Sequence, residues 1–158
     1  MTNEGIEPLE PETWLAQFNK LAGRPHDGEA LASSLRLAFH LVQLTPRPLR
    51  HLIRCTLSES SFDALLESGG FAEAALALLG EQTGYTVSRL PGGTAVTAEV
   101  RLAGDASGCE AAGATLASAV FAAWLGRLAS LDEPEPADAS RSVRHKDQSG
   151  LRPRSTEH

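Results

Sequence analysis

The first half of the chain carries apolar residues at helical spacing, interrupted by prolines and glycines. This pattern predicts helices at about residues 11–22 and 29–44, a further helix at 48–57, and short helices that open at Ser60 and at Phe71. The 29–44 helix is apolar around most of its circumference, so we expect it to lie near the centre of the core.

After residue 80 the apolar period changes from about 3.6 residues to 2. Residues 96–102 alternate strictly between apolar and polar, and residues 85–88 are the predicted partner strand. The Leu-Pro-Gly-Gly sequence at 90–93 supplies turn residues, so the two segments predict a β-hairpin. Ser107 and Glu110 then have capping-box spacing, which predicts a long helix reaching about Leu131.

Together these elements predict an α+β fold that is mainly helical, with four or five helices and one β-hairpin packed against them. We expect a single domain over residues 11–131, made of a helical half (11–80) and a hairpin with a long helix (84–131). Residues 1–10 are expected to form a flexible acidic leader. Residues 132–158 lack apolar periodicity and are expected to form a disordered tail.

Composition narrows the class of protein. Of the 158 residues, 42% are hydrophobic, which is enough for a core, yet no apolar run is long enough to span a membrane. The acidic N-terminus does not resemble a signal peptide. Two cysteines do not make a disulfide framework, so a reducing cytoplasm is the expected location and no membrane partner is expected.

The net charge of −6 is unevenly distributed along the chain. Residues 1–15 carry −4 and residues 58–131 carry −5, whereas residues 16–57 carry +4 from six bases and two acids. The acidic average therefore hides a basic central stretch, and the chain is strongly charge-segregated.

The basic charge concentrates on the helix predicted at 48–57. Arg47, Arg50, His51 and Arg54 are spaced to share one side of that helix, opposite its apolar residues. With the preceding helix and the Thr-Pro-Arg-Pro connection, they give a layout similar to a helix–turn–helix. This basic segment is a candidate binding face for nucleic-acid phosphates or for an acidic protein surface.

An acidic stripe follows the basic segment. Glu59, Asp63 and Glu67 are each four residues apart, so they share one helix face that could complement the basic segment within a homodimer or on a partner. Three carboxylates on one helix are poorly arranged to surround a cation, and we expect no metal and no cofactor.

The two cysteines are candidate reactive thiols. Cys55 lies four residues after His51, and Cys109 falls in the first turn of the predicted last helix, where the helix dipole would lower its pKa. No further nucleophile, base and oxyanion donor can be assembled from the sequence.

These observations favour a small non-enzymatic protein-interaction protein, acting as an adaptor or regulator. A lone hairpin is marginal in water, so pairing with a second copy through the hairpin edge or the Ala-rich last helix is one expected interface. The alternative is a nucleic-acid-binding accessory factor that uses the basic segment. A third hypothesis is a thiol-based redox or enzyme activity through Cys55 or Cys109.

Overall fold

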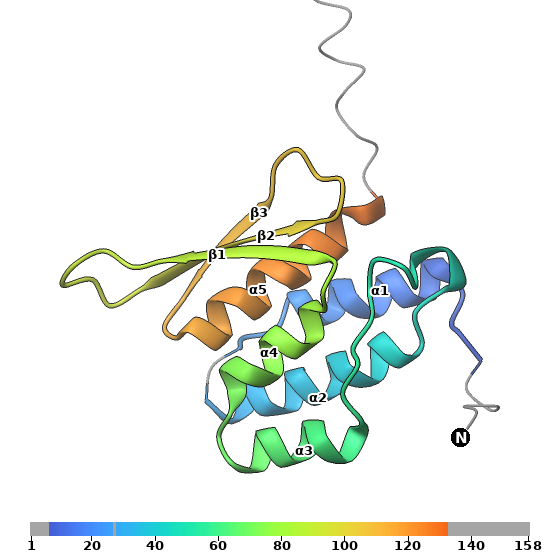
Figure 1. Cartoon of the computed structure of the whole chain (residues 1–158), viewed down its shortest axis with the longest axis horizontal. Coiled ribbons are helices and arrows are strands. Elements are labelled where there is room, and N and C mark those ends of the chain that lie inside the picture. The colour runs from blue at the N-terminus through green and yellow to red at the C-terminus, as the bar shows by residue number, and fades with distance from the viewer. Residues whose placement is uncertain (1–6, 27, 133–158) are drawn as a thin grey trace, which may run out of the picture.

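The computed structural model describes residues 7–26 and 28–132, in which helices pack on one face of a three-stranded sheet (Figure 1). The mainly helical α+β class is confirmed. The described elements, in chain order, are α1 Pro11–Ala22, α2 Glu29–Gln43, the 3-10 turn η1 Arg47–Leu49, α3 Glu59–Glu67, α4 Phe71–Leu79, β1 Thr83–Ser88, β2 Val96–Leu102, β3 Cys109–Gly113, α5 Leu116–Ala129 and the 3-10 turn η2 Ser130–Asp132.

The predicted hairpin is the β1–β2 pair of an antiparallel sheet with the order β1-β2-β3. Thr83 is opposite Leu102 and Ser88 is opposite Thr97, with no break in register. The alternation predicted for 96–102 is observed, because β2 buries every second residue, from Val96 to Leu102. The tip of the β1–β2 hairpin projects beyond the helices (Figure 1).

The helix predicted from Ser107 to Leu131 is wrong in its first part. Residues 109–113 form β3, which pairs with β2, and α5 begins only at Leu116. The capping box is made by Thr115, whose side chain accepts from the Ser118 backbone N–H while the Ser118 hydroxyl accepts from the Thr115 N–H. As a strand, residues 109–113 form main-chain hydrogen bonds with β2, whereas the N–H groups at the start of a helix would have to bond to water.

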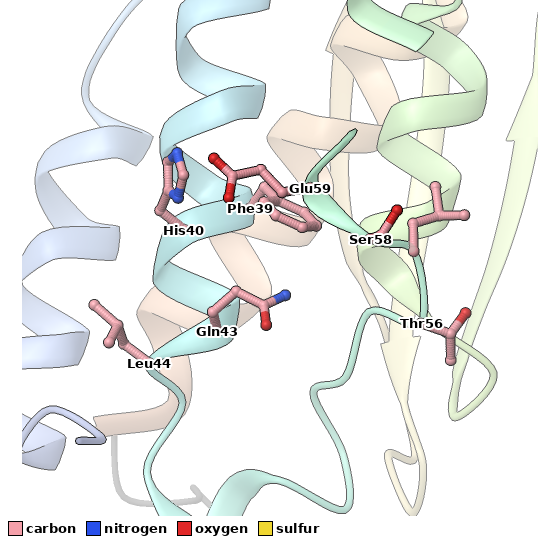
Figure 2. Close-up of a pocket in the computed structure, with 8 residues that line it drawn as sticks. Phe39, His40, Gln43, Leu44, Thr56, Ser58 and Glu59 are labelled. Atoms are coloured by element: carbon pink, nitrogen blue, oxygen red, sulfur yellow. The ribbon is translucent and has the colours of Figure 1, made fainter. Parts of the chain in front are cut away.

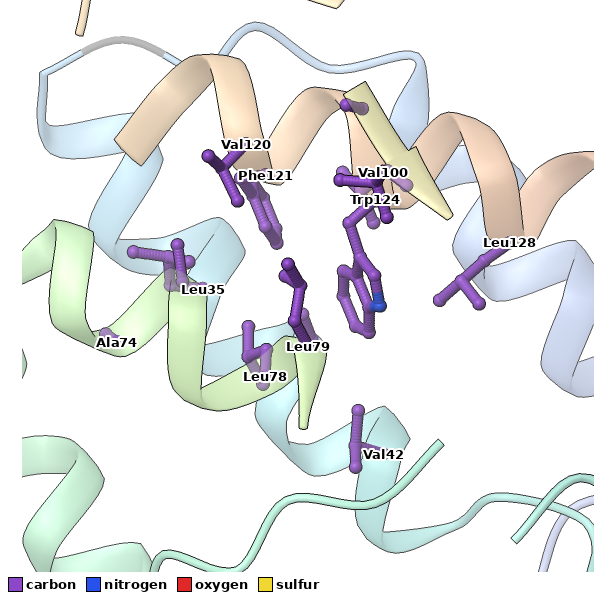
Figure 3. Packing of buried hydrophobic residues seen from close by; sticks show 14 of the residues in the cluster. Leu35, Val42, Ala74, Leu78, Leu79, Val100, Val120, Phe121, Trp124 and Leu128 are labelled. Atoms are coloured by element: carbon purple, nitrogen blue, oxygen red, sulfur yellow. The ribbon is translucent and has the colours of Figure 1, made fainter. Parts of the chain in front are cut away.

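Helix α5 lies at the centre of the molecule. It contacts β2 and β3 on one side and α1 and α4 on the other, so it is buried nearly all round. Figure 3 shows Trp124 and Phe121 of α5 among leucines of α2, α4 and α5. The ring of Phe18 packs edge-on against Trp124, and Trp14 packs against Phe18, which joins α1 to the same core.

The chain ends lie mostly outside the described residues. The predicted tail at 133–158 and residues 1–6 of the predicted leader are among them. Among the described residues 7–10, the Leu9 N–H donates to the Leu44 carbonyl at 3.1 Å. No helix within the described ranges is long and apolar enough to cross a membrane.

Candidate interaction surfaces

The basic segment is not the face of a helix. The predicted 48–57 helix is wrong: the chain forms the 3-10 turn Arg47–Leu49, makes one further turn, and runs without helix to Ser58. One turn suffices to bring Leu49 and Ile53 together, since the Ile53 N–H donates to the Leu49 carbonyl at 3.0 Å. The helix–turn–helix layout is therefore wrong as well, because its second helix is missing.

Three of the four basic side chains nevertheless converge. Arg50, His51 and Arg54 are exposed and line one small hollow of about 160 Å³, together with residues that follow α4. Arg47 is exposed but does not line this hollow. The turn gathers side chains that the predicted helix would have spread along its length.

The acidic stripe lies on one helix, as its spacing predicts, because Glu59, Asp63 and Glu67 all belong to α3. Asp63 does not meet the basic segment. Its carboxylate accepts from Nε of Arg36 on α2 at 3.1 Å, with side chains 38% and 47% exposed. An ion pair this exposed contributes little to stability, so the stripe is mainly a solvated face.

A groove lies between α2 and residues 56–59, with a volume of about 590 Å³. Figure 2 shows Phe39, His40 and Gln43 on the α2 side and Ser58 and Glu59 on the other. Phe39 forms its apolar floor and stacks on Phe62 at 4.5 Å between ring centroids. Sequence reasoning missed this groove, because its two walls come from segments whose packing no periodicity reveals.

Both cysteines are free thiols in environments that oppose ionisation. Burial raises the pKa of Cys55, more than a hydrogen bond from the Leu57 backbone lowers it. Cys109 lies in β3 and not at a helix N-terminus, so the predicted dipole effect is wrong, and burial raises its pKa too. Within the described ranges, no three His, Cys, Asp or Glu side chains could together hold a metal ion.

Strand β1 has no neighbour on its outer side within the described residues. The Leu102 N–H donates to the Asp105 carboxylate, and the Leu102 carbonyl accepts from the Asp105 backbone N–H. Both main-chain groups of Leu102 therefore point toward the β2–β3 turn. Main-chain groups of successive strand residues point to alternate sides, so only every second pair in the β1–β2 register is hydrogen-bonded. The pair of Leu102 with Thr83 is not bonded, which leaves Gly84, Thr86 and Ser88 as the β1 residues bonded to β2. The N–H and C=O groups of Tyr85 and Val87 therefore point outward from the sheet.

This free edge lacks the usual protection of an edge strand. Thr83–Ser88 contains no charged residue and no proline, and its register with β2 has no bulge. The Tyr85 side chain is 48% exposed beside the open main-chain groups. The sequence predicted the hairpin but not which of its edges stays open, because that depends on the position of β3.

Comparison of the chain with protein-family models, with curated proteins and with solved structures gives no match.

Proposed function

We propose that this chain is a small, non-enzymatic protein-interaction protein of the cytoplasm that self-associates through the free edge of β1. The observation that carries the proposal is the pair of outward N–H and C=O groups at Tyr85 and Val87 on an uncharged strand. Such an edge is a template for an added strand.

A second copy fits this edge by symmetry. Antiparallel pairing of β1 with itself, centred on Thr86, sets Tyr85 of each copy opposite Val87 of the other, with both residues exchanging main-chain hydrogen bonds. Aromatic and β-branched residues make favourable cross-strand pairs. The paired stretch carries no charge, so two chains of net charge −6 can approach there without local repulsion.

The expected affinity is modest. Four main-chain hydrogen bonds contribute roughly 1 kcal/mol each, and association costs about 4 kcal/mol or more before any apolar gain. Burial of two half-exposed tyrosines adds roughly 2 kcal/mol each and makes the balance favourable, so we expect a Kd of about a millimolar. The Ala-rich helix α5, the other interface considered from the sequence, is already buried inside the molecule.

The alternatives have weaker support. A nucleic-acid reader would need the helix that the basic segment does not form. A thiol activity would need a lowered thiol pKa, whereas the pKa values of Cys55 and Cys109 are both raised. The two free thiols are compatible with a reducing cytoplasm.

Sedimentation equilibrium of the full chain, at concentrations from micromolar to several millimolar, tests the proposal. We expect the wild type to approach twice its 16.7 kDa mass, and Tyr85→Lys to stay monomeric because it places a charge on the open edge. Val87→Pro should also stay monomeric, since it removes an N–H that β2 does not use. Ala112→Lys, on the exposed face of β3, is the matched control and should dimerise normally. A wild-type chain that remains monomeric at the highest concentration overturns the proposal.

A further inference from the structure

A small hollow opens at the surface where the basic segment meets the chain after α4. Its volume is about 160 Å³. Most of its lining residues are polar, and they come from two segments: Arg50, His51, Leu52, Arg54 and Thr56 from the first, and Glu81 and Gln82 from the second. We refer to it as the basic hollow.

Both arginines line the basic hollow, and neither forms an ion pair with the described residues. Nε of Arg50 donates to the buried Thr45 carbonyl at 3.2 Å, which fixes the base of that guanidinium and leaves its terminal nitrogens available. The ion pairs of the described residues use Arg36, Arg101 and Arg127, and no carboxylate lies within 4.0 Å of Arg50 or Arg54 there. Two guanidinium groups that line one hollow without an ion-pair partner attract an anion to it.

Gly80 is the reason the second segment reaches the basic hollow. It has a φ of 74°, and a Cβ at this position would lie 2.5 Å from the Arg54 carbonyl oxygen. This close approach sets Gln82 beside Arg54 as a further donor. The same approach also places Glu81 in the lining of the hollow, where the negative charge of its carboxylate weakens the binding of an anion.

We propose that the basic hollow binds the phosphoryl group of a small phosphorylated solute. Two guanidinium groups, an imidazole, an amide and a hydroxyl offer more donors than a carboxylate ligand could use, whereas a phosphoryl group presents three oxygens. The hollow is smaller than the cavities that enclose drug-sized ligands, so it accepts one such group and leaves the rest of the solute outside.

A nucleic-acid backbone is a poorer occupant. It needs a row of cations along the surface, whereas the site is a single hollow with Glu81 in its wall and the chain is acidic overall. This inference uses different residues from the β1 edge and does not depend on self-association.

Titration of the ¹⁵N-labelled full chain with inorganic phosphate, at constant pH and with chloride holding the ionic strength, tests the inference. We expect saturable amide shifts confined to residues 50–56 and 81–82. Arg54→Gln should weaken phosphate binding about tenfold by removing one charge-assisted donor. Glu81→Gln should strengthen binding about threefold or more, because it removes the opposing charge. Arg24→Gln, an exposed arginine outside the hollow, is the control and should leave the affinity unchanged.

Opposite shifts in affinity for the two hollow variants support the inference, and neither variant removes a buried side chain. The inference is overturned if phosphate moves these amides no more than chloride does, or if Glu81→Gln leaves the affinity unchanged. Tighter, steeply salt-dependent binding of a single-stranded oligonucleotide at the same residues also overturns it, in favour of a nucleic-acid ligand.

Discussion

At the scale of single residues, the backbone of Gly80 is decisive for how the surface is built. Its φ of 74° and ψ of −177° belong to a region that is open almost only to glycine. The same residue allows the Arg54 backbone to approach. A residue with no side chain therefore determines which groups surround the basic hollow.

Replacing Gly80 with alanine should destabilise the fold by about 1–3 kcal/mol from backbone strain, with a further cost from contact with the Arg54 carbonyl. Urea denaturation measures the change. Gly92→Ala is a comparison variant, because Gly92 also has a positive φ, of 73°, but open space around its Cβ position, so alanine there meets no neighbouring atom. A loss for Gly80→Ala no larger than the loss for Gly92→Ala would contradict the combined cost of backbone strain and the Arg54 contact at Gly80.

At the scale of elements, the β2–β3 turn is fastened to α5 by one carboxylate. Asp105 accepts from the Leu102 N–H and from Nε and Nη2 of Arg127, at 2.8, 2.7 and 2.8 Å. The side chains of Arg127 and Asp105 are only 21% and 14% exposed, so water screens this pair less than the Arg36–Asp63 pair. The Arg127 hydrogen bonds are the main cause that lowers the pKa of Asp105.

Asp105→Asn should cost about 1–3 kcal/mol of unfolding free energy at neutral pH, because it removes the charge from these hydrogen bonds. A lowered folded-state pKa stabilises the fold above the unfolded pKa of about 3.9, and this contribution is lost as the pH falls from there through the folded pKa. The difference in unfolding free energy between the wild type and Asp105→Asn should therefore become smaller at acidic pH. Thermal unfolding across pH measures it, and Asp63→Asn, in the exposed pair, should change stability by less than about 0.5 kcal/mol.

At the scale of the whole molecule, one core joins the helical part to the sheet. Trp14 in α1 and Trp124 in α5 meet through Phe18, and the same buried cluster includes Val100 of β2. Helix α5 contacts both parts, so neither can keep its apolar face buried without the other.

We therefore expect a single cooperative unfolding transition. Tryptophan fluorescence, which reports on Trp14 and Trp124 at the core, and far-UV circular dichroism, which reports on all helices, should give the same midpoint in urea. Separate midpoints would show that the helical half and the sheet unfold independently.

Local patterns predicted most of the elements but not their connections. The 11–22, 29–44 and 71–79 helices and the 96–102 strand were predicted because each buries one face at a regular period. The basic segment also carries helical spacing, at Leu49, Leu52, Ile53 and Leu57, yet it forms only one turn, so periodicity alone does not decide its structure. Residues 109–113 include two alanines and a glutamate, which favour a helix locally, but pairing with β2 makes them a strand.

Sequence alone is enough to predict the class of fold, the segment that carries the basic charge and the hairpin, because these follow from periodicity and composition within short windows. The packing of the described residues leaves β1 as a free edge, brings Glu81 and Gln82 to the hollow that Arg54 lines, and partly buries both thiols. Each of these depends on contacts between segments far apart in the chain, and burial and hydrogen bonding there outweigh local preference.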